Sequence, residues 1–232
     1  MCVDCGCRAP AAPPARRTLE LGQALLSRND ALAAQLRQRF GAAGLPVLNL
    51  LSSPGSGKTA LLERLGSELA ATGRRLAVIV GDLATDNDAR RLQAAGVQAV
   101  QITTGQACHL EAAMVERALE ALPEPLSVFD LLVIENVGNL VCPAAYDLGE
   151  SRRVVLLSVT EGEDKPLKYP ATFHSADVVV LSKCDIAEVV GFDLAHARRH
   201  IERVAPKARI VELSARTGAG MAALLQALPH LP

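Results

Sequence analysis

With 232 residues, the chain is long enough for one domain with a sizeable core, or for one domain and a tail. Half of its residues are apolar and 21% are charged, which excludes a wholly disordered or collagen-like chain. The net charge is -1 and only 3% of residues are aromatic, so we expect neither nucleic acid nor a membrane as a partner.

The N-terminal segment combines clustered cysteines with a proline-rich stretch. It lacks the pattern of a signal peptide, and no apolar run approaches the roughly 18 residues of a membrane span, so we expect a cytoplasmic protein with reduced thiols. Residues 8–17 contain only Ala, Pro and Arg, which favours an extended spacer. We therefore expect a Cys-rich metal-binding head and linker over residues 1–17 and one domain over residues 18–232.

The expected domain alternates between helices and buried strands. A stripe of apolar residues from Leu21 to Phe40 predicts a first helix, ended by Gly41 and Gly44. Apolar runs predict strands at 47–51, 76–80, 97–102, 130–134, 153–159, 177–181 and 209–213. Helical patterns follow the first strand and recur near 86–95, 107–122, 193–204 and 219–228. This order predicts an α/β fold, a mainly parallel sheet with helices on both faces.

A phosphate-binding loop is expected between the first strand and the next helix. The segment Ser52-Ser53-Pro54-Gly55-Ser56-Gly57-Lys58-Thr59 departs from the G-x-x-x-x-G-K-[ST] pattern only at Ser52, where a glycine is usual. Gly55 and Gly57 allow backbone N–H groups around Ser56 to turn toward a phosphate. Lys58 can reach the β- and γ-phosphates, and the Thr59 hydroxyl can bind Mg²⁺. The alternative is a turn with a solvated lysine, which the strand–loop–helix context disfavours.

Two acidic residues at strand ends are candidates for the Mg²⁺ site and for ordering water. Asp82 follows the strand at 76–80, and Glu135 ends the strand at 130–134 in a Walker B pattern. Asp82 is also our candidate for activating water, with Lys58 offsetting the charge that develops. Exposed strand-end acids are the alternative for both. Asp86 and Asp88 are weaker candidates because either can be a helix N-cap.

Two later segments indicate which base is bound. Leu181-Ser182-Lys183-Cys184-Asp185 resembles the N-K-x-D element of GTP-binding proteins, with serine replacing asparagine. The Asp185 carboxylate can accept hydrogen bonds from guanine, and the stem of Lys183 can lie over the base. Ser214-Ala215-Arg216 resembles the S-A-K element, with arginine replacing lysine. Together these segments favour GTP over ATP, although an ion pair at the surface is the alternative reading of Lys183 and Asp185.

Side chains that are able to bind a metal ion occur in two parts of the sequence. Cys2-x-x-Cys5-Gly6-Cys7 offers three thiolates that suit square-planar Ni²⁺ or tetrahedral Zn²⁺, with a redox pair or incidental thiols as alternatives. Cys108 and His109 are adjacent, and Cys142 lies seven residues after Glu135. We expect Cys108 in a first helical turn, where the dipole favours its thiolate. Both cysteines are equally compatible with roles as small buried apolar residues.

Nearly the whole chain resembles the hydrogenase nickel-insertion GTPases (HypB), of the SIMIBI class. The resemblance is carried by the N-terminal cysteine motif, the phosphate loop, and the segments 81–88 (GDLATDND), 105–110 (GQACHL) and 135–143 (ENVGNLVCP). It implies a GTPase with Mg²⁺ and GTP or GDP bound. It also implies a tight nickel site at Cys2, Cys5 and Cys7. Cys108, His109 and Cys142 would form a second, weaker nickel or zinc site, which would lie at a dimer interface.

The resemblance further implies partners. These are a second copy of the chain, a companion nickel/zinc metallochaperone, a prolyl-isomerase nickel chaperone and the hydrogenase large-subunit precursor. Our leading hypothesis is a slow GTPase whose nucleotide state changes the position of Cys142 relative to Cys108 and His109. Three alternatives remain: a P-loop kinase acting on a small molecule, a metal-storage module with a structural or regulatory nucleotide site, and a GTPase serving urease or a cobalamin enzyme.

Overall fold

The computed structural model describes residues 14–228, with side chains from residue 23 onward. The expected metal-binding head with Cys2, Cys5 and Cys7 lies outside the described residues. Among the helices that the structure does describe, none has the length and apolar character needed to cross a bilayer.

A seven-stranded sheet forms the centre of the molecule, and each pair of neighbouring strands is parallel. Its strands are β1 (Val47–Ser52), β2 (Leu76–Asp82), β3 (Gln98–Thr103), β4 (Leu131–Glu135), β5 (Arg152–Ser158), β6 (Val178–Ser182) and β7 (Arg209–Glu212). They lie in the order β3-β2-β4-β1-β5-β6-β7, so β1 is central, β4 lies between β1 and β2, and β5 to β7 extend the sheet on the other side of β1. The parallel sheet expected from the apolar runs is confirmed.

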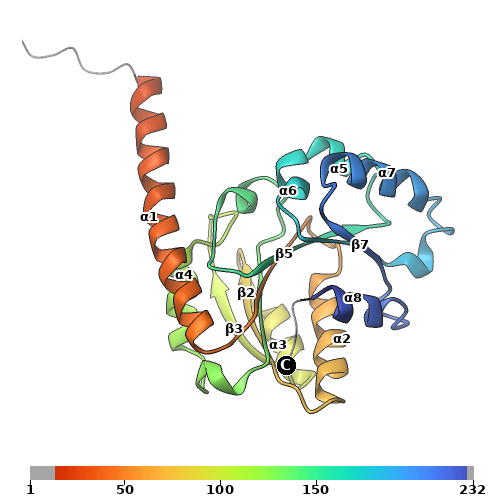
Figure 1. Ribbon diagram of the computed structural model, residues 1–232, viewed down its shortest axis with the longest axis horizontal. Coiled ribbons are helices and arrows are strands. Elements are labelled where there is room, and N and C mark those ends of the chain that lie inside the picture. The colour runs from red at the N-terminus through yellow and green to blue at the C-terminus, as the bar shows by residue number, and fades with distance from the viewer. Residues whose placement is uncertain (1–13, 229–232) are drawn as a thin grey trace, which may run out of the picture.

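Helices cover both faces of this sheet (Figure 1). They are α1 (Pro14–Ala42), α2 (Lys58–Ala70), α3 (Asn87–Ala94), α4 (Ala112–Glu120), α5 (Lys165–Lys168), α6 (Pro170–His174), α7 (Leu194–Val204) and α8 (Met221–Ala227). Three short 3-10 helices are η1 (Leu126–Val128), η2 (Cys142–Ala145) and η3 (Cys184–Ile186). Apolar side chains of α2, α3 and α8 form a core on one face. The other face packs against α1 and α4 over one half and against α6 and α7 over the other.

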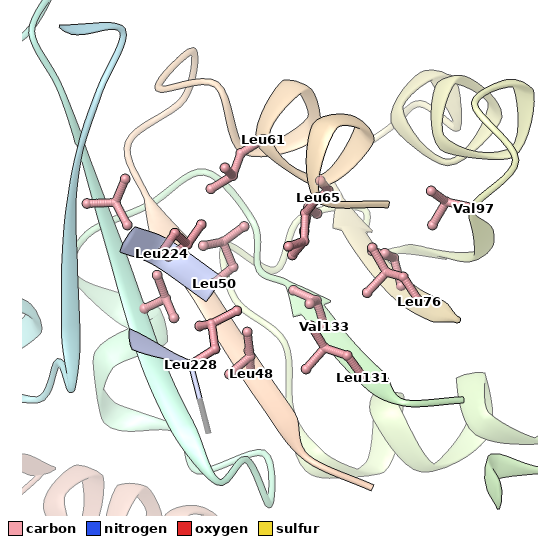
Figure 2. Packing of buried hydrophobic residues seen from close by; sticks show 14 of the residues in the cluster. Leu48, Leu50, Leu61, Leu65, Leu76, Val97, Leu131, Val133, Leu224 and Leu228 are labelled. Atoms are coloured by element: carbon pink, nitrogen blue, oxygen red, sulfur yellow. The ribbon is translucent and has the colours of Figure 1, made fainter. Parts of the chain in front are cut away.

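The core beneath α2 shows how the strand sequences produce these layers (Figure 2). Leu48 and Leu50 of β1 belong to the same core cluster as Leu61 and Leu65 of α2, and in Figure 2 Leu48 lies beside Leu228. Because side chains alternate along a strand, Val47 and Leu51 point to the opposite face. A strand that is apolar on both faces fits only between two layers of helices, which is why the apolar runs predicted this architecture.

The first helix differs from the expectation. It begins at Pro14, so the prediction of an extended spacer through residue 17 is wrong for residues 14–17. Proline is well tolerated in the first turn of a helix, and alanine and arginine are strong helix formers, so this composition also suits a helix start. The C-terminal part of α1 packs on the sheet through Leu36 and Phe40, whereas Leu25 is 63% exposed. In Figure 1 the N-terminal part of α1 projects beyond the sheet.

The parallel arrangement determines where a functional site can lie. All seven strands end at the same edge of the sheet, and Ser52, Asp82, Glu135 and Ser182 are each the last residue of a strand. Ligands of open parallel sheets bind outside the carboxyl ends of the strands. The phosphate loop, both candidate acids and the expected base-binding segments are therefore gathered at this edge.

Candidate functional site

The phosphate loop connects β1 to the start of α2. Gly55 and Gly57 have positive φ angles of 73° and 95°, which residues with side chains rarely adopt. These conformations turn the chain so that α2 begins directly at Lys58. The unpaired N–H groups of the first helical turn and the positive end of the helix dipole therefore lie at the loop, an arrangement that suits a phosphate.

Lys58 is buried inside this loop. Its Nζ donates a hydrogen bond to Ser52 Oγ at 3.1 Å. Burial lowers the pKa of Lys58, and the nearby carboxylate of Glu135 partly opposes that effect. The serine that departs from the usual glycine thus supplies an oxygen to the lysine, so the substitution is compatible with the role expected of Lys58.

Glu135 and Thr59 lie together behind the loop. Thr59 Oγ1 donates to Glu135 Oε1 at 3.2 Å, and Glu135 is only 2% exposed. Burial raises the pKa of Glu135 to about 7, against the opposing effect of Lys58. Its second oxygen, Oε2, is buried without a hydrogen-bond partner among the described residues. A carboxylate oxygen without a partner beside a hydroxyl is a donor set that fits Mg²⁺.

Asp82 lies at the same edge but is held by its own loop. Its Oδ1 accepts hydrogen bonds from the N–H groups of Ala84 and Thr85 at 2.9 and 2.8 Å. Burial acts to raise the pKa of Asp82, but these hydrogen bonds outweigh it and the pKa is lowered. The carboxylate is therefore ionised at neutral pH and lies in the electrostatic field of Lys58.

The expected base-binding residues line one cavity of about 320 Å³. Lys183, Asp185, Ser214 and Ala215 all border it, together with Ser56 and Gly57 of the phosphate loop. Lys183 adopts a positive φ of 60°, and its Nζ donates to the carbonyl oxygen of Gly55 at 2.7 Å. The structure therefore places the two base-recognition segments beside the phosphate loop, as a bound nucleotide requires.

Asp185 and Lys183 do not share a partner. The Asp185 carboxylate is 2.8 Å from Arg216, whereas Lys183 is bonded to the phosphate loop. Hydrogen bonds from Ser214 and Arg216 lower the pKa of Asp185, so its carboxylate stays an acceptor at neutral pH. Asp185 and Lys183 therefore both line the cavity, but they do not form an ion pair with each other.

Glu161 belongs to this site but was missed by the sequence reasoning. Its Oε1 accepts from Ser56 Oγ at 3.0 Å, and Lys165 lies 3.1 Å from its second oxygen. Lys165 also donates to Ser53 Oγ at 3.1 Å, so the pair supports the phosphate loop from the β5 side. The signal was present, because Glu161 follows an apolar strand as Asp82 and Glu135 do.

A cluster of three potential metal ligands lies at the same edge. The ligand atoms of Cys108, His109 and Cys142 are all within 4.8 Å of one another, and all three residues are half-buried. Cys108 Sγ is 3.9 Å from His109 Nδ1. Two thiols and an imidazole suit a soft or borderline ion such as Ni²⁺ or Zn²⁺. The cluster favours the ligand interpretation of these cysteines over that of small apolar residues.

The environment of Cys108 differs from the expectation. Helix α4 begins at Ala112 and not near residue 107, so Cys108 is outside the helix and its thiolate gains nothing from a first helical turn. Its pKa is raised, first by a hydrogen bond with Cys142 and then by burial. The helix starts late because the N–H groups of Leu110 and Ala112 bond to the side chains of Asn136 and Asn29 at 3.2 and 2.9 Å.

His109 is oriented by an aromatic neighbour. Its ring stacks on Tyr146 with centroids 4.0 Å apart and an angle of 24° between the planes. Its Nε2 is buried and has no hydrogen-bond partner among the described residues, although Glu111 lies 3.6 Å away. The ring nitrogen that lies 3.9 Å from Cys108 Sγ is Nδ1, so Nδ1 is the nitrogen placed to share an ion with that thiol, whereas Nε2 lies beside Glu111.

Comparisons with known proteins show which family the chain belongs to. A model of the CobW/HypB/UreG nucleotide-binding domain matches residues 46–212. The hydrogenase maturation factor HypB of Azotobacter chroococcum mcd 1 is 54% identical over 205 residues, and the match spans 88% of this chain and 66% of that protein. The crystal structure of Helicobacter pylori HypB in complex with nickel has a TM-score of 0.81 and 45% identity. That match covers 86% of this chain and 92% of the other.

A more distant structure shares the fold alone. The 54 kDa signal recognition particle protein of Aeropyrum pernix K1, solved in complex with GDP, has a TM-score of 0.56 and 15% identity. The match covers 79% of this chain and 46% of that one. The P-loop NTPase fold expected from the sequence is therefore confirmed, and the chain belongs to the CobW/HypB/UreG family of P-loop GTPases, within its HypB group.

Proposed function

We propose that this protein is a nickel-handling GTPase that binds nickel and helps to deliver it to the precursor of the [NiFe]-hydrogenase large subunit. The observation that carries the proposal is the continuity between the two sites. Glu135 contacts the phosphate loop, and Cys142 lies on the segment that leaves it. Nickel is the cargo, and GTP binding and hydrolysis control how tightly it is held.

The nucleotide site follows from the residues at the strand ends. The phosphates lie against Gly55, Ser56, Gly57, Lys58 and Thr59, and Lys183, Asp185, Ser214 and Ala215 hold the guanine. Thr59, Glu135 and Asp82 would hold Mg²⁺, which would supply positive charge beside the β- and γ-phosphates. Lys58 offsets the charge that develops as the γ-phosphoryl group leaves, and Asp82 orders the attacking water. We expect slow turnover, because no residue other than Asp82 is a candidate for activating the water and Asp82 is a weak one.

Two nickel sites are part of the proposal. Cys108, His109 and Cys142 supply three donors, which leaves a position for water or for a donor from a second subunit. Zn²⁺ suits the same donors. Cys2, Cys5 and Cys7 form the tighter site. We expect a homodimer promoted by GTP or by metal.

The segment between Glu135 and Cys142 packs directly on the phosphate loop. Ser52 pairs with Asn139 in an antiparallel bridge, and a Cβ added at Gly138 would lie 3.0 Å from Pro54. Asn139 also donates through its side chain to the carbonyl oxygen of Cys108 at 3.2 Å. A shift of the phosphate loop would therefore move both Cys142, which lies on this segment, and Cys108, which is hydrogen-bonded to it. Coupling of this kind typically changes affinity about 5- to 150-fold.

Delivery requires partners beyond this chain. We expect the companion nickel/zinc metallochaperone, a prolyl-isomerase nickel chaperone and the large-subunit precursor, all in the cytoplasm. The relative from Azotobacter chroococcum is described as a hydrogenase maturation factor. Capture of the large-subunit precursor by nickel-loaded protein, and its loss after GTP hydrolysis, would test this part of the proposal.

The deciding experiment measures nickel affinity in the two nucleotide states. Full-length protein with Cys2, Cys5 and Cys7 replaced by serine isolates the site at Cys108, His109 and Cys142. Nickel is titrated in the presence of GDP and of a non-hydrolysable GTP analogue. We expect affinities that differ about 5- to 150-fold. Equal affinities would show that the nucleotide does not control the metal.

Two matched substitutions test the ligand assignment in the same background. Cys142→Ser should abolish nickel binding, because it removes one of three donors. Cys184→Ser is the control, since Cys184 is also half-buried but bonds to the carbonyl oxygen of Leu181. Absence of GTP hydrolysis in the wild type would instead favour a storage module, and preference for ATP would favour a kinase.

A further inference from the structure

Two asparagines are fully buried in the centre of the sheet, where apolar residues are usual. Asn49 is in the middle of β1, and Asn136 directly follows Glu135 at the end of β4; both are 0% exposed. Asn49 points to the same face as Val47 and Leu51 because side chains alternate along a strand. A buried amide is costly unless all of its groups are hydrogen-bonded, so the partners of these side chains reveal what the residues do.

Asn136 holds the segment that carries two of the metal ligands. Its Oδ1 accepts hydrogen bonds from the N–H groups of Leu110 at 3.2 Å and Val137 at 3.0 Å. Leu110 directly follows Cys108 and His109, so this contact fixes the backbone at the end of that pair. Asn136 is itself anchored to β1, since its N–H donates to the carbonyl oxygen of Leu50 at 3.1 Å.

Asn49 extends the contact across the sheet to Glu150. Asn136 Nδ2 donates to Asn49 Oδ1 at 3.2 Å, and Asn49 Nδ2 donates to Glu150 Oε1 at 3.2 Å. Glu150 is 8% exposed and also forms an ion pair with Arg153, whose Nε is 2.6 Å from the same oxygen. Asn136, Asn49, Glu150 and Arg153 therefore form one continuous chain of hydrogen bonds, which is buried from Asn136 to Glu150 and half-buried at Arg153.

The far end of this chain holds the segment that carries the third ligand. The two terminal nitrogens of Arg153 donate to the carbonyl oxygens of Ala144 and Tyr146, each at 2.8 Å. Ala144 is in η2, the short helix that begins at Cys142, and Tyr146 stacks on the ring of His109. Both ligand-bearing segments are thus tied to opposite ends of a single polar chain.

We propose that Asn136, Asn49, Glu150 and Arg153 are positioning residues that set the separation between Cys142 and the Cys108–His109 pair. None of the four is among the clustered ligands, so they act through the backbone segments that they hold. The inference rests on the proposed function only in taking these three side chains as metal ligands. Outer partners that orient metal ligands typically contribute about 10- to 100-fold to metal affinity.

Asn49→Ala tests the inference because it removes the middle of the chain without touching either ligand-bearing segment. The background is full-length protein with serine at positions 2, 5 and 7, saturated with GDP. We expect nickel affinity to fall about 10- to 100-fold and the thiolate-to-nickel charge-transfer band to change in position or intensity. Affinity for a fluorescent GDP analogue should stay within about 3-fold, because the side chain of Asn49 is hydrogen-bonded to Asn136 and Glu150 and not to the phosphate loop.

Arg153→Lys is a second variant that keeps the positive charge near Glu150 but cannot hold both carbonyl oxygens. It should also weaken nickel binding, so the inference stays testable if Asn49→Ala folds poorly. Val211→Ala is the matched control for a loss of stability, since Val211 is a buried residue of β7 on the other half of the sheet. We expect it to leave nickel affinity and the absorption band unchanged.

The outcomes separate this inference from the proposed function. If the background protein binds no nickel, the assignment of the three ligands is wrong and the positioning role is lost with it. If the background binds nickel but Asn49→Ala and Arg153→Lys match it in affinity and spectrum, only the positioning role is overturned. An equal loss of affinity in Val211→Ala would assign the effect to general destabilisation and would also overturn it.

Discussion

Ser182 donates a hydrogen bond from its Oγ to the carbonyl oxygen of Ser56 at 2.8 Å, which joins the base-binding segment to the phosphate loop. Ser182 is only 4% exposed, so the bond is shielded from water. It occupies the position where the N-K-x-D pattern has asparagine. The serine is therefore compatible with a nucleotide site, because it still links the two segments that we propose to hold the base and the phosphates.

Replacing Ser182 with alanine should weaken nucleotide binding. The change leaves the buried Ser56 carbonyl without this donor, at a cost of about 1–2 kcal/mol. GDP affinity should fall by up to about 5- to 30-fold, to the extent that bound nucleotide requires the loop to be held in this position. Titration with a fluorescent GDP analogue measures the effect. Ser175→Ala is the control, since it removes a bond of the same length to Thr172 at the end of α6. Equal losses in both variants would contradict the link.

Asp185→Asn should change which base is bound. A carboxylate accepts from guanine N1–H and N2–H₂, whereas the asparagine amide presents a donor in place of one acceptor. We expect GDP affinity to fall about 100-fold and a xanthine nucleotide to bind better than GDP. Arg216→Ala, which removes the partner of Asp185 but keeps the carboxylate, should change GDP affinity by less than about 3-fold. A variant that binds ATP as well as GDP would point to a different base-recognition mode.

The fold could be predicted because the strands are apolar on both faces and end in recognisable residues. Each of the seven runs forms a strand within two residues of its expected limits. The start of α4 could not be predicted, because it is set by Asn136 and Asn29 from distant parts of the chain. Local sequence contains no information on such contacts. The same reason explains why the prediction for the Cys108 thiol was wrong.

The candidate site could be predicted only in part. The phosphate loop and the expected base-binding segments are contiguous patterns, so the sequence alone identifies their residues. Cys108 follows β3 and Cys142 follows β4, and β2 lies between these strands. Nothing in the spacing of the two cysteines indicates that loops from non-adjacent strands converge. Glu161 was overlooked although it has the same strand-end signal as Glu135.

Ser52→Gly restores the usual glycine and should expose the role of the serine hydroxyl. Without nucleotide, the buried Lys58 loses its 3.1 Å acceptor, so we expect a loss of about 1 kcal/mol, or about 2–4 °C in Tm. With GDP bound, phosphate oxygens can replace that acceptor, so the loss in Tm should be smaller. Differential scanning fluorimetry with and without GDP measures both values. Equal losses would show that the hydroxyl acts through the backbone rather than through Lys58.

Glu135→Gln should stabilise the protein in the absence of nucleotide and Mg²⁺, and more strongly at high pH. Burial raises the pKa of Glu135 from 4.5 to about 7, so the folded state holds a proton that the unfolded state releases between these values. Its contribution is therefore fully present below pH 4.5 and is lost as the pH rises through about 7, a change of about 3 kcal/mol. Glutamine does not titrate and avoids that loss.

The expected result is a difference in unfolding free energy between Glu135→Gln and wild type that is about 1 kcal/mol or less at pH 5 and rises to about 3 kcal/mol at pH 8, measured by urea denaturation. The pKa of about 7 already includes the opposing attraction between Glu135 and Lys58, so this gain is the net effect of both. Glu202→Gln, at an exposed position of α7, is the matched control for replacing a glutamate by glutamine. A difference that stays constant between pH 5 and 8 would mean that Glu135 is ionised throughout. The same substitution should weaken Mg²⁺-dependent GTP binding, because it removes a negatively charged ligand for Mg²⁺. The variant would then be more stable than the wild type but less active.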